Sequence, residues 1–184
     1  NSTRDYFVGV NSVAAGRTAG LLMGRFIAES GEILVVTNSM RSRDSLERRL
    51  GFGDVMASEF PHLTVLPSVE SFDDRRRMED VVGQVVLSRP NIVGVYSMGS
   101  GNRPLLSALR KSGRLGGLVV IAHELTETTR QALQDDEIAA VINQNVGHLA
   151  RSAIRVLRAL CDSVAIFEAQ ERVRIEVVLR ENLP

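Results

Sequence analysis

Short apolar runs alternate with longer amphipathic segments along this chain, and this alternation constrains the fold more than any other feature. Residues 33–37, 92–96 and 118–122 are apolar almost throughout and rich in β-branched side chains, which is typical of strands buried on both faces. Between such runs, apolar residues recur at the helical period. Strands and helices that alternate at intervals of about 25 to 30 residues indicate a parallel sheet covered on both faces. We therefore predict an α/β fold with a doubly wound parallel sheet.

The hydrophobic period and the helix-breaking residues divide the chain into individual elements. We expect strands at residues 7–10, 33–37, 63–66, 92–96, 118–122, 139–142 and 173–179. We expect helices at residues 14–29, 42–59, 72–87, 103–112, 127–134 and 146–160. No internal repeat, low-complexity tract or long linker interrupts this order.

Composition narrows the classes of function. The 22 basic and 22 acidic side chains balance, which argues against a segment that grips nucleic acid by itself. The single cysteine, Cys161, cannot form an internal disulfide, and this fits a reducing compartment. No apolar run approaches the roughly 18 residues of a membrane span. We expect a cytoplasmic protein without membrane association. We also expect that the chain is cut from a longer one, because the first expected strand follows Asn1 almost at once.

Polar side chains follow each expected strand at its carboxyl end, which is where open parallel sheets bind their ligands. Amides and hydroxyls dominate, with a carboxylate and an aromatic ring among them. Carboxylates and amides hydrogen-bond vicinal hydroxyls, and an aromatic face packs on a sugar ring. The set therefore predicts a neutral polyhydroxylated ligand, a sugar or polyol. The residues are Asn38, Ser39, Met40, Arg41, Glu70, Ser71, Phe72, residues 97–102, His123, Glu124, Thr126 and residues 143–145.

Motifs for catalysis are missing from the sequence. Residues 98–102 contain glycines but form neither a phosphate-binding loop nor a complete dinucleotide fingerprint. The three histidines lie far apart without a cysteine companion, so no metal spacing is present. There is no G-x-S-x-G elbow, and Glu124 has no second acid in its loop. We expect a protein that is not an enzyme and that uses no cofactor and no metal.

Three short segments, in order and spacing, resemble the lac repressor family of bacterial transcription factors. Residues 8–17, Val-Gly-Val-Asn-Ser-Val-Ala-Ala-Gly-Arg, are similar to the crossover between the family's two lobes. Arg48-Arg49-Leu50-Gly51-Phe52 resembles its Arg-x-x-Gly-Phe motif, and Asn143-Gln144-Asn145 its return segment. The resemblance covers essentially the whole chain.

This resemblance implies a fold like that of type I periplasmic binding proteins, and it divides the chain. Residues 1–13 would be the crossover from the first lobe. Residues 14–142 would form the second, carboxyl-terminal lobe of an effector-binding domain. Residues 143–184 would provide the return crossover, a first-lobe helix and the final strand, so the chain comprises mainly the second lobe with remnants of the first.

The resemblance also implies four ligand contacts. Arg48 would contact a ligand hydroxyl or carboxylate, Phe72 would stack on the ligand, and Glu124 and Gln144 would provide an acidic and a polar contact. The strand-end pattern adds Ser39, Met98 and His123 as candidates. The sequence departs from the family after the third long strand, where residues 96–102 replace Ala-Asn-Asp. It departs again at residues 122–125, where Ala-His-Glu-Leu replaces Gly-x-Asp-Asp, so the ligand's identity stays open.

Each candidate also has a structural alternative. Arg48 could pair with Asp44 on a helix surface, and Phe72 could be a hydrophobic staple. Glu124 could cap the helix near Thr126, His123 could be a satisfied loop histidine, and Asn102 could cap the helix that follows it. The run of three arginines at residues 75–77 could bind phosphate. On an amphipathic helix, however, such a run is more typical of a face exposed to solvent.

Together these features predict the ligand-sensing domain of a bacterial repressor. A sugar or polyol effector would close two lobes and change how a homodimer presents helix-turn-helix segments, absent from this chain, to operator DNA. The alternative is a periplasmic sugar-binding protein of a transporter, which would share the fold and the pocket. An α/β enzyme with a non-standard site is the third and least favoured hypothesis.

Overall fold

The computed structural model describes residues 6–184, the side chains of residues 168 and 169 apart, and contains one seven-stranded sheet. The strands run in the order β2-β1-β4-β5-β6-β7, and β3 pairs separately with β1. Every pairing is parallel except that of β6 with β7. The strands are β1 Gly31–Thr37, β2 Leu63–Val65, β3 Val69–Glu70, β4 Ile92–Ser97, β5 Val119–His123, β6 Ala140–Gln144 and β7 Ile175–Val178.

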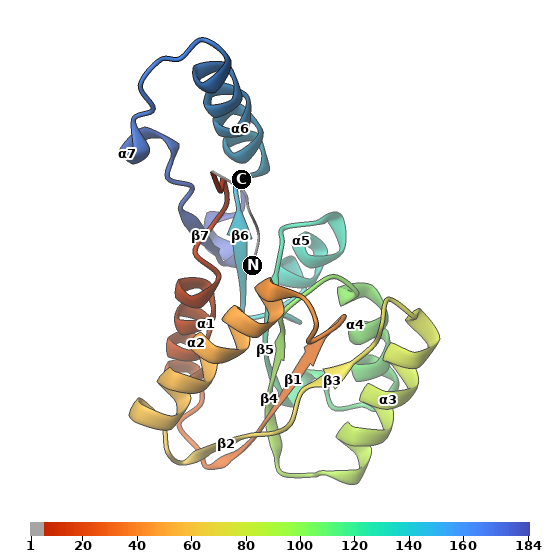
Figure 1. The fold of residues 1–184 in the computed structure, drawn as a ribbon. Coiled ribbons are helices and arrows are strands. Elements are labelled where there is room, and N and C mark those ends of the chain that lie inside the picture. The colour runs from red at the N-terminus through yellow and green to blue at the C-terminus, as the bar shows by residue number, and fades with distance from the viewer. Residues whose placement is uncertain (1–5) are drawn as a thin grey trace.

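Helices cover both faces of this sheet, so the predicted α/β doubly wound fold is confirmed (Figure 1). Helices α1 and α2 pack on one face, and α3, α4 and α5 on the other. The helices are α1 Ser12–Phe26, α2 Arg43–Glu59, α3 Arg75–Ser88, α4 Asn102–Lys111, α5 Glu127–Gln134, α6 Val146–Cys161 and α7 Glu168–Glu171.

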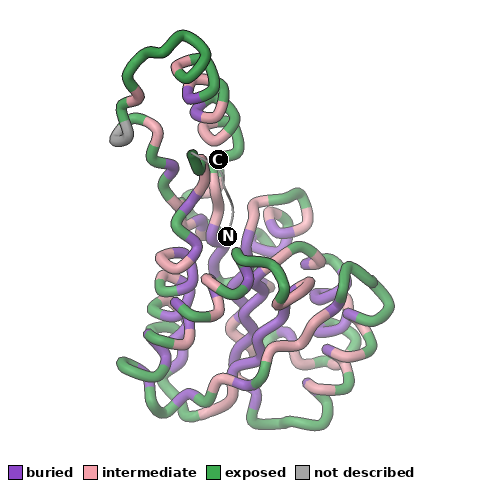
Figure 2. The backbone as a smooth tube through the Cα atoms, in the orientation of Figure 1, coloured by how far each residue is buried: buried purple, intermediate pink, exposed green. Residues whose placement is uncertain are grey.

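The two faces carry separate hydrophobic cores. In β1, Leu34 and Val36 point into the core under α3 and α4, whereas Ile33 and Val35 point into the core under α1 and α2. All four side chains are fully buried. A strand that faces two cores has to be apolar at consecutive positions, and this explains the continuous apolar runs in the sequence. The buried centre of the sheet is evident in Figure 2.

Helices α1 and α2 approach so closely that their backbones touch. A Cβ atom on Gly16 would collide with the carbonyl oxygen of Arg48, and one on Gly51 with the carbonyl oxygen of Val13. Only glycine permits this crossing. The contact fixes the position of α2, and with it the backbone from which Arg48 extends toward the sheet.

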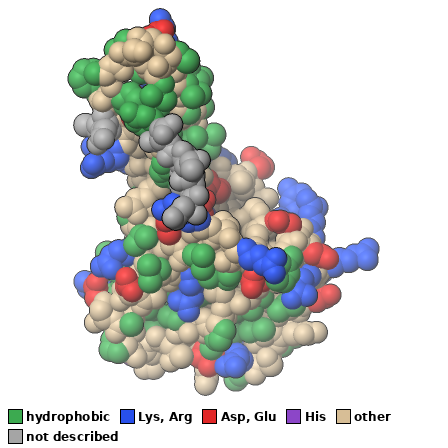
Figure 3. Space-filling model, in the orientation of Figure 1, with side chains coloured by type: hydrophobic (Ala, Val, Ile, Leu, Met, Phe, Trp, Pro, Cys, Tyr) green, Lys and Arg blue, Asp and Glu red, His purple; other side chains and the backbone are tan. Residues whose placement is uncertain are grey.

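Helix α6 lies away from the body of the molecule, beyond the end of β6 (Figure 1). Its side chains Val146, Ile154 and Leu157 are more than 60% exposed. Hydrophobic side chains gather on this part of the surface in Figure 3. The described part of the chain therefore leaves an apolar helix face without a covering layer.

The structure corrects three element predictions. Residues 7–10 form no strand, because no described strand lies beside them to pair; residues 1–5 of the expected crossover lie outside the described residues. The short strand β3 was not predicted, since two residues show no period. Helix α3 begins at Arg75 rather than at Phe72, because Asp74 accepts from the backbone N–H groups of Arg76 and Arg77 and caps it.

Among residues 6–184, no helix combines the length and the hydropathy that crossing a bilayer requires.

The α1–α2 crossing makes a stability prediction. Replacing Gly51 by alanine should lower the free energy of unfolding by about 1–3 kcal/mol, because the added methyl group forces two backbones apart. The matched control is Gly83→Ala in α3, where a Cβ meets nothing within 4 Å; that change should raise stability by about 0.5–1 kcal/mol. Urea unfolding measures both, and equal effects of the two substitutions would refute the crossing.

Candidate functional site

Three of the predicted ligand contacts meet at the carboxyl edge of the sheet. Arg48 comes from α2, Glu124 follows β5, and Gln144 ends β6. The Gln144 Nε2 atom donates to Glu124 Oε1 at 2.9 Å, and Arg48 Nη2 lies 3.8 Å from the same oxygen. We call these three residues the Arg48 cluster.

Arg48 is only 8% exposed, although its charge requires partners. Its Nη1 donates to the Met98 carbonyl oxygen at 2.6 Å, and its ion pair is with Glu124 rather than with Asp44 on its own helix. Its Nε is buried and has no hydrogen-bond partner among the described residues. A buried guanidinium with a donor that has no partner is costly, and the nearby Glu124 carboxylate offsets part of this cost.

Aromatic rings form the layer beneath Arg48. The Tyr96 hydroxyl lies 2.8 Å from His123 Nε2, and the Tyr96 ring stacks on Phe52 with centroids 4.4 Å apart. His123 is 2% exposed; burial, aided by the Arg48 charge, lowers its pKa well below the ordinary range, so the ring is neutral. Burial likewise raises the pKa of Tyr96. His123 therefore has a hydrogen-bond partner within the protein, as expected for the structural alternative to a ligand contact.

Glu124 is held by its backbone in a left-handed conformation, with φ 67°. Burial raises the pKa of its carboxyl group, while Arg48 and Gln144 act in the opposite direction. The side chain does not cap α5, because Thr126 and Thr129 form a capping box there. About a third of the Glu124 side chain remains exposed, so the carboxylate is available at the edge.

Phe72 lies on the same edge, after β3, but apart from the Arg48 cluster. Its ring is 54% exposed, and the Arg77 guanidinium carbon lies 5.1 Å from the ring centroid. Phe72 and Asp73 both have positive φ, at 52° and 62°, and the Phe72 N–H donates to the Asn38 carbonyl at 2.7 Å. The ring therefore stands in solvent on a strained turn, and ligand stacking by Phe72 stays a prediction.

The two remaining candidates differ from each other. The Ser39 hydroxyl accepts from the Arg41 N–H at 3.1 Å and is partly exposed, so it can still reach a ligand. The Met98 side chain is 1% exposed within the core under α1 and α2. Ligand contact by Met98 therefore stays a prediction, and in this structure its carbonyl group accepts a hydrogen bond from Arg48.

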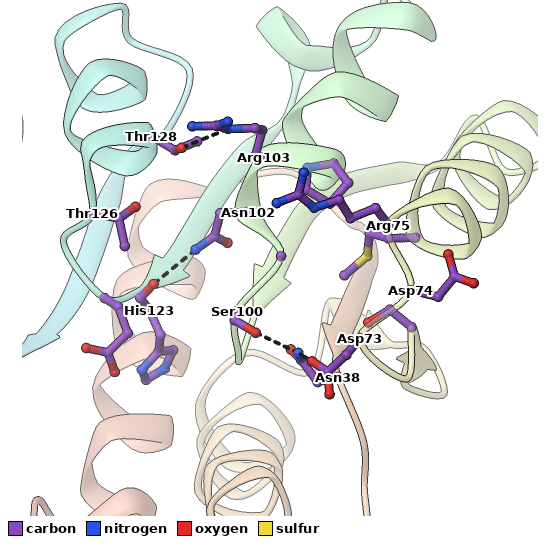
Figure 4. Close-up of a pocket in the computed structure, with 15 residues that line it drawn as sticks. Asn38, Asp73, Asp74, Arg75, Ser100, Asn102, Arg103, His123, Thr126 and Thr128 are labelled. Atoms are coloured by element: carbon purple, nitrogen blue, oxygen red, sulfur yellow. Dashed lines mark hydrogen bonds between the residues drawn. The ribbon is translucent and has the colours of Figure 1, made fainter.

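A hollow of about 490 Å³ opens beside Glu124, between the starts of α3, α4 and α5 (Figure 4). We call it the α4 cavity. His123 and Glu124 are the predicted contacts that line it. Its other charged residues, Asp73, Asp74, Arg75 and Arg103, were not among the predicted contacts. Their signal was positional only, because each lies in or next to the first turn of a helix that follows a strand.

Two asparagines join the loops around the α4 cavity. The Asn38 amide donates to the Ser100 hydroxyl at 2.6 Å and to the Asp73 carboxylate. The Asn102 side chain accepts from the Ser97 hydroxyl at 2.7 Å and donates to the His123 carbonyl at 3.1 Å. Asn102 therefore ties β4 to β5 instead of capping α4, whose cap position is Gly101.

In the part of the chain that the structure describes, no three His, Cys, Asp or Glu side chains are grouped to hold a metal ion.

In open, mostly parallel α/β sheets such as this one, ligands bind in the crevice at the carboxyl edge, where the Arg48 cluster lies. Residues 1–163 match the periplasmic binding protein domain family, and the chain belongs to that family. No curated protein matches the sequence.

Solved structures share the fold. A glucose-galactose binding protein, GanP, from Geobacillus stearothermophilus superposes with a TM-score of 0.89 at 18% identity over 100% of this chain and 65% of that one. A sugar-binding protein of a Bacillus halodurans sugar ABC transporter gives 0.84 at 22%, over 99% and 66%. A Burkholderia graminis solute binding protein in complex with D-arabinose gives 0.86 at 24%, over 98% and 63%. The chain therefore spans slightly less than two thirds of these proteins.

The neutral state of His123 makes a pH prediction. The unfolded chain protonates this histidine near its ordinary pKa of about 6.5, whereas the folded protein does so only at much lower pH. Below pH 6.5 the unfolded state therefore binds more protons, and stability should fall by up to about 1.4 kcal/mol per pH unit from this group alone.

Urea unfolding between pH 7.5 and 5.5 measures that slope. A His123→Asn variant should show a shallower slope, whatever its absolute stability. An unchanged slope would show that His123 does not titrate as a buried neutral ring.

Proposed function

We propose that this chain is the major part of a domain that binds a monosaccharide-sized sugar at the carboxyl edge of its sheet. The observation that carries the proposal is the cluster of the buried Arg48 guanidinium with the partly exposed side chains of Glu124 and Gln144. A ligand at this edge would meet the part of the Glu124 carboxylate that remains exposed, while Arg48 supplies the neighbouring positive charge.

The chemistry of the edge suits hydroxyl groups on neighbouring carbons. The Glu124 carboxylate can accept hydrogen bonds at both oxygens, and the Arg48 guanidinium donates in a fixed planar arrangement. The Gln144 amide can both donate and accept hydrogen bonds. The exposed ring of Phe72 offers a surface for the C–H face of a sugar. The related structures named above are described as binding glucose, galactose or arabinose, which supports the same ligand class here.

The domain division also remains our proposal: residues 1–13 and 143–184 belong to crossovers and a first lobe, and residues 14–142 form the second lobe. The exposed apolar face of α6 supports it, because a first lobe would cover that face. A ligand would then bind between two lobes and favour the closed arrangement of the domain.

Two biological settings fit this domain. The similar solved structures include sugar-binding proteins of transporters, and this supports the transporter setting better than the repressor setting. The repressor setting is favoured by one observation, the ordered likeness of residues 8–17, Arg48 to Phe52 and Asn143 to Asn145 to the lac repressor family. In that setting the protein is a cytoplasmic homodimer that binds operator DNA, and the sugar is its effector.

Thermal unfolding of the full-length gene product with glucose, galactose and arabinose tests sugar binding. A ligand bound only by the folded state raises the melting temperature. Glu124→Gln should weaken the binding about ten- to hundred-fold, because it removes a charged acceptor. Isothermal titration of the variant with the best sugar measures the loss.

Glu127→Gln is the matched control, since Glu127 is exposed in the first turn of α5, three residues after Glu124, and does not line the cavity. It should bind as the parent does. No thermal shift with any sugar, or equal binding by both glutamine variants, would contradict the proposal.

The part of the reading frame that lies on the 5′ side of the Asn1 codon distinguishes the two settings. A basic helix-turn-helix segment there would decide for the repressor, and a secretion signal for the transporter. Gel-shift assays of the full-length protein with its own promoter region, with and without sugar, test the repressor setting directly. A monomer that binds sugar but no DNA would contradict that setting.

A further inference from the structure

Two arginines border the α4 cavity without acidic partners. Arg75 begins α3 and Arg103 is the second residue of α4. Among the residues that the structure describes, neither guanidinium forms an ion pair; the recorded contact of Arg103 is a long one, 3.4 Å from its Nε to the Thr128 hydroxyl. Figure 4 shows Arg75 reaching toward Asn102 and Arg103 extending toward Thr128, and both residues line the cavity.

The acidic groups of the cavity are already engaged elsewhere. The Asp74 carboxylate caps α3 through the backbone N–H groups of Arg76 and Arg77, and Figure 4 shows it pointing away from the Arg75 guanidinium. The Asp73 carboxylate accepts from the Asn38 amide. Glu124 accepts from Gln144 and faces Arg48. Asp73 and Asp74 are thus held by neutral donors and Glu124 by Arg48, whereas Arg75 and Arg103 have no ion-pair partner among the described residues.

The start of α4 adds further hydrogen-bond donors beside the cavity. Its cap residue is Gly101, with φ 96°, and no side chain caps the first turn. The backbone N–H groups there carry the positive end of the helix dipole. This supports the charge of the two arginines but would not define a site without them.

We propose that the α4 cavity binds an anionic group, a carboxylate or a phosphate, carried by the sugar whose ring lies at the Arg48 cluster. Arg75 and Arg103 would hold the anion from two sides, with the Thr126 and Thr128 hydroxyls as further donors. This inference rests on the proposed function, because Glu124 borders both the Arg48 cluster and the cavity. It narrows the proposed ligand class from sugars in general to sugar acids or sugar phosphates, in place of the neutral ligand that the sequence predicts.

The geometry leaves room for both parts of such a ligand. A volume of about 490 Å³ is within the range of roughly 300–1,000 Å³ typical of small-molecule sites. A bound anion would be attracted by both guanidinium groups. Binding should therefore weaken as salt concentration rises, which a neutral sugar would not show.

Matched ligands test the proposal on the full-length protein. The probes are D-glucose, D-glucuronate and D-glucose 6-phosphate, with the corresponding galactose series, and inorganic phosphate alone. Isothermal titration should give at least ten-fold tighter binding for one acidic member than for its neutral parent. Preference for the uronate or for the phosphate ester identifies the source of the charge.

Charge-removing variants test the residues. Arg75→Gln and Arg103→Gln should each weaken the acidic ligand at least ten-fold and leave the neutral parent within two-fold. Arg76→Gln is the matched control, since Arg76 makes the same charge change from an exposed neighbouring position that does not line the cavity. It should leave both ligands unaffected.

The outcomes separate the two proposals. Equal affinity for neutral and acidic sugars, or losses in Arg75→Gln and Arg103→Gln no larger than in Arg76→Gln, overturns the anionic subsite and leaves sugar binding intact. Inorganic phosphate that binds as tightly as the best acidic sugar overturns the link to the Arg48 cluster. Absence of binding by every sugar overturns the proposed function and this inference together.

Discussion

A single buried charge, the Arg48 guanidinium, organises the candidate site. Removing a cation from water is favourable only when acceptors surround it, and the protein provides one carbonyl oxygen and one carboxylate at the longer distance of 3.8 Å. The same charge helps to keep His123 neutral and partly offsets the effect of burial on Glu124. The contact of α1 and α2 at Gly16 and Gly51 holds the arginine in place.

The fold could be predicted from the sequence because burial leaves a periodic trace. Strands that face two cores are apolar at every position, and the helices between them are amphipathic because they cover the sheet. These two patterns predict the order of the elements. Features with no period were missed or misplaced: the short β3, the unpaired residues 7–10, and the left-handed turn at Phe72 and Asp73 that delays the start of α3.

The site could be predicted in part, for a related reason. Parallel strands bring their carboxyl ends together, and this placed Glu124 and Gln144 beside Arg48. The burial of the Met98 side chain depends on which way one residue faces after β4, and the strand-end pattern does not encode that. Arg75 was interpreted as part of a solvated charge run, because a sequence does not reveal which member of the run turns over a cavity.

A crystal structure of the full-length protein with its best-binding sugar tests the central claim most directly. The measurement is the distance from the Glu124 carboxylate oxygens to the nearest ligand hydroxyl group. We predict a hydrogen bond of about 2.5–3.0 Å, with Gln144 contacting a hydroxyl group of the same ring. A sugar bound elsewhere, or a Glu124 carboxylate that contacts no hydroxyl group while the sugar occupies the edge, would contradict the account.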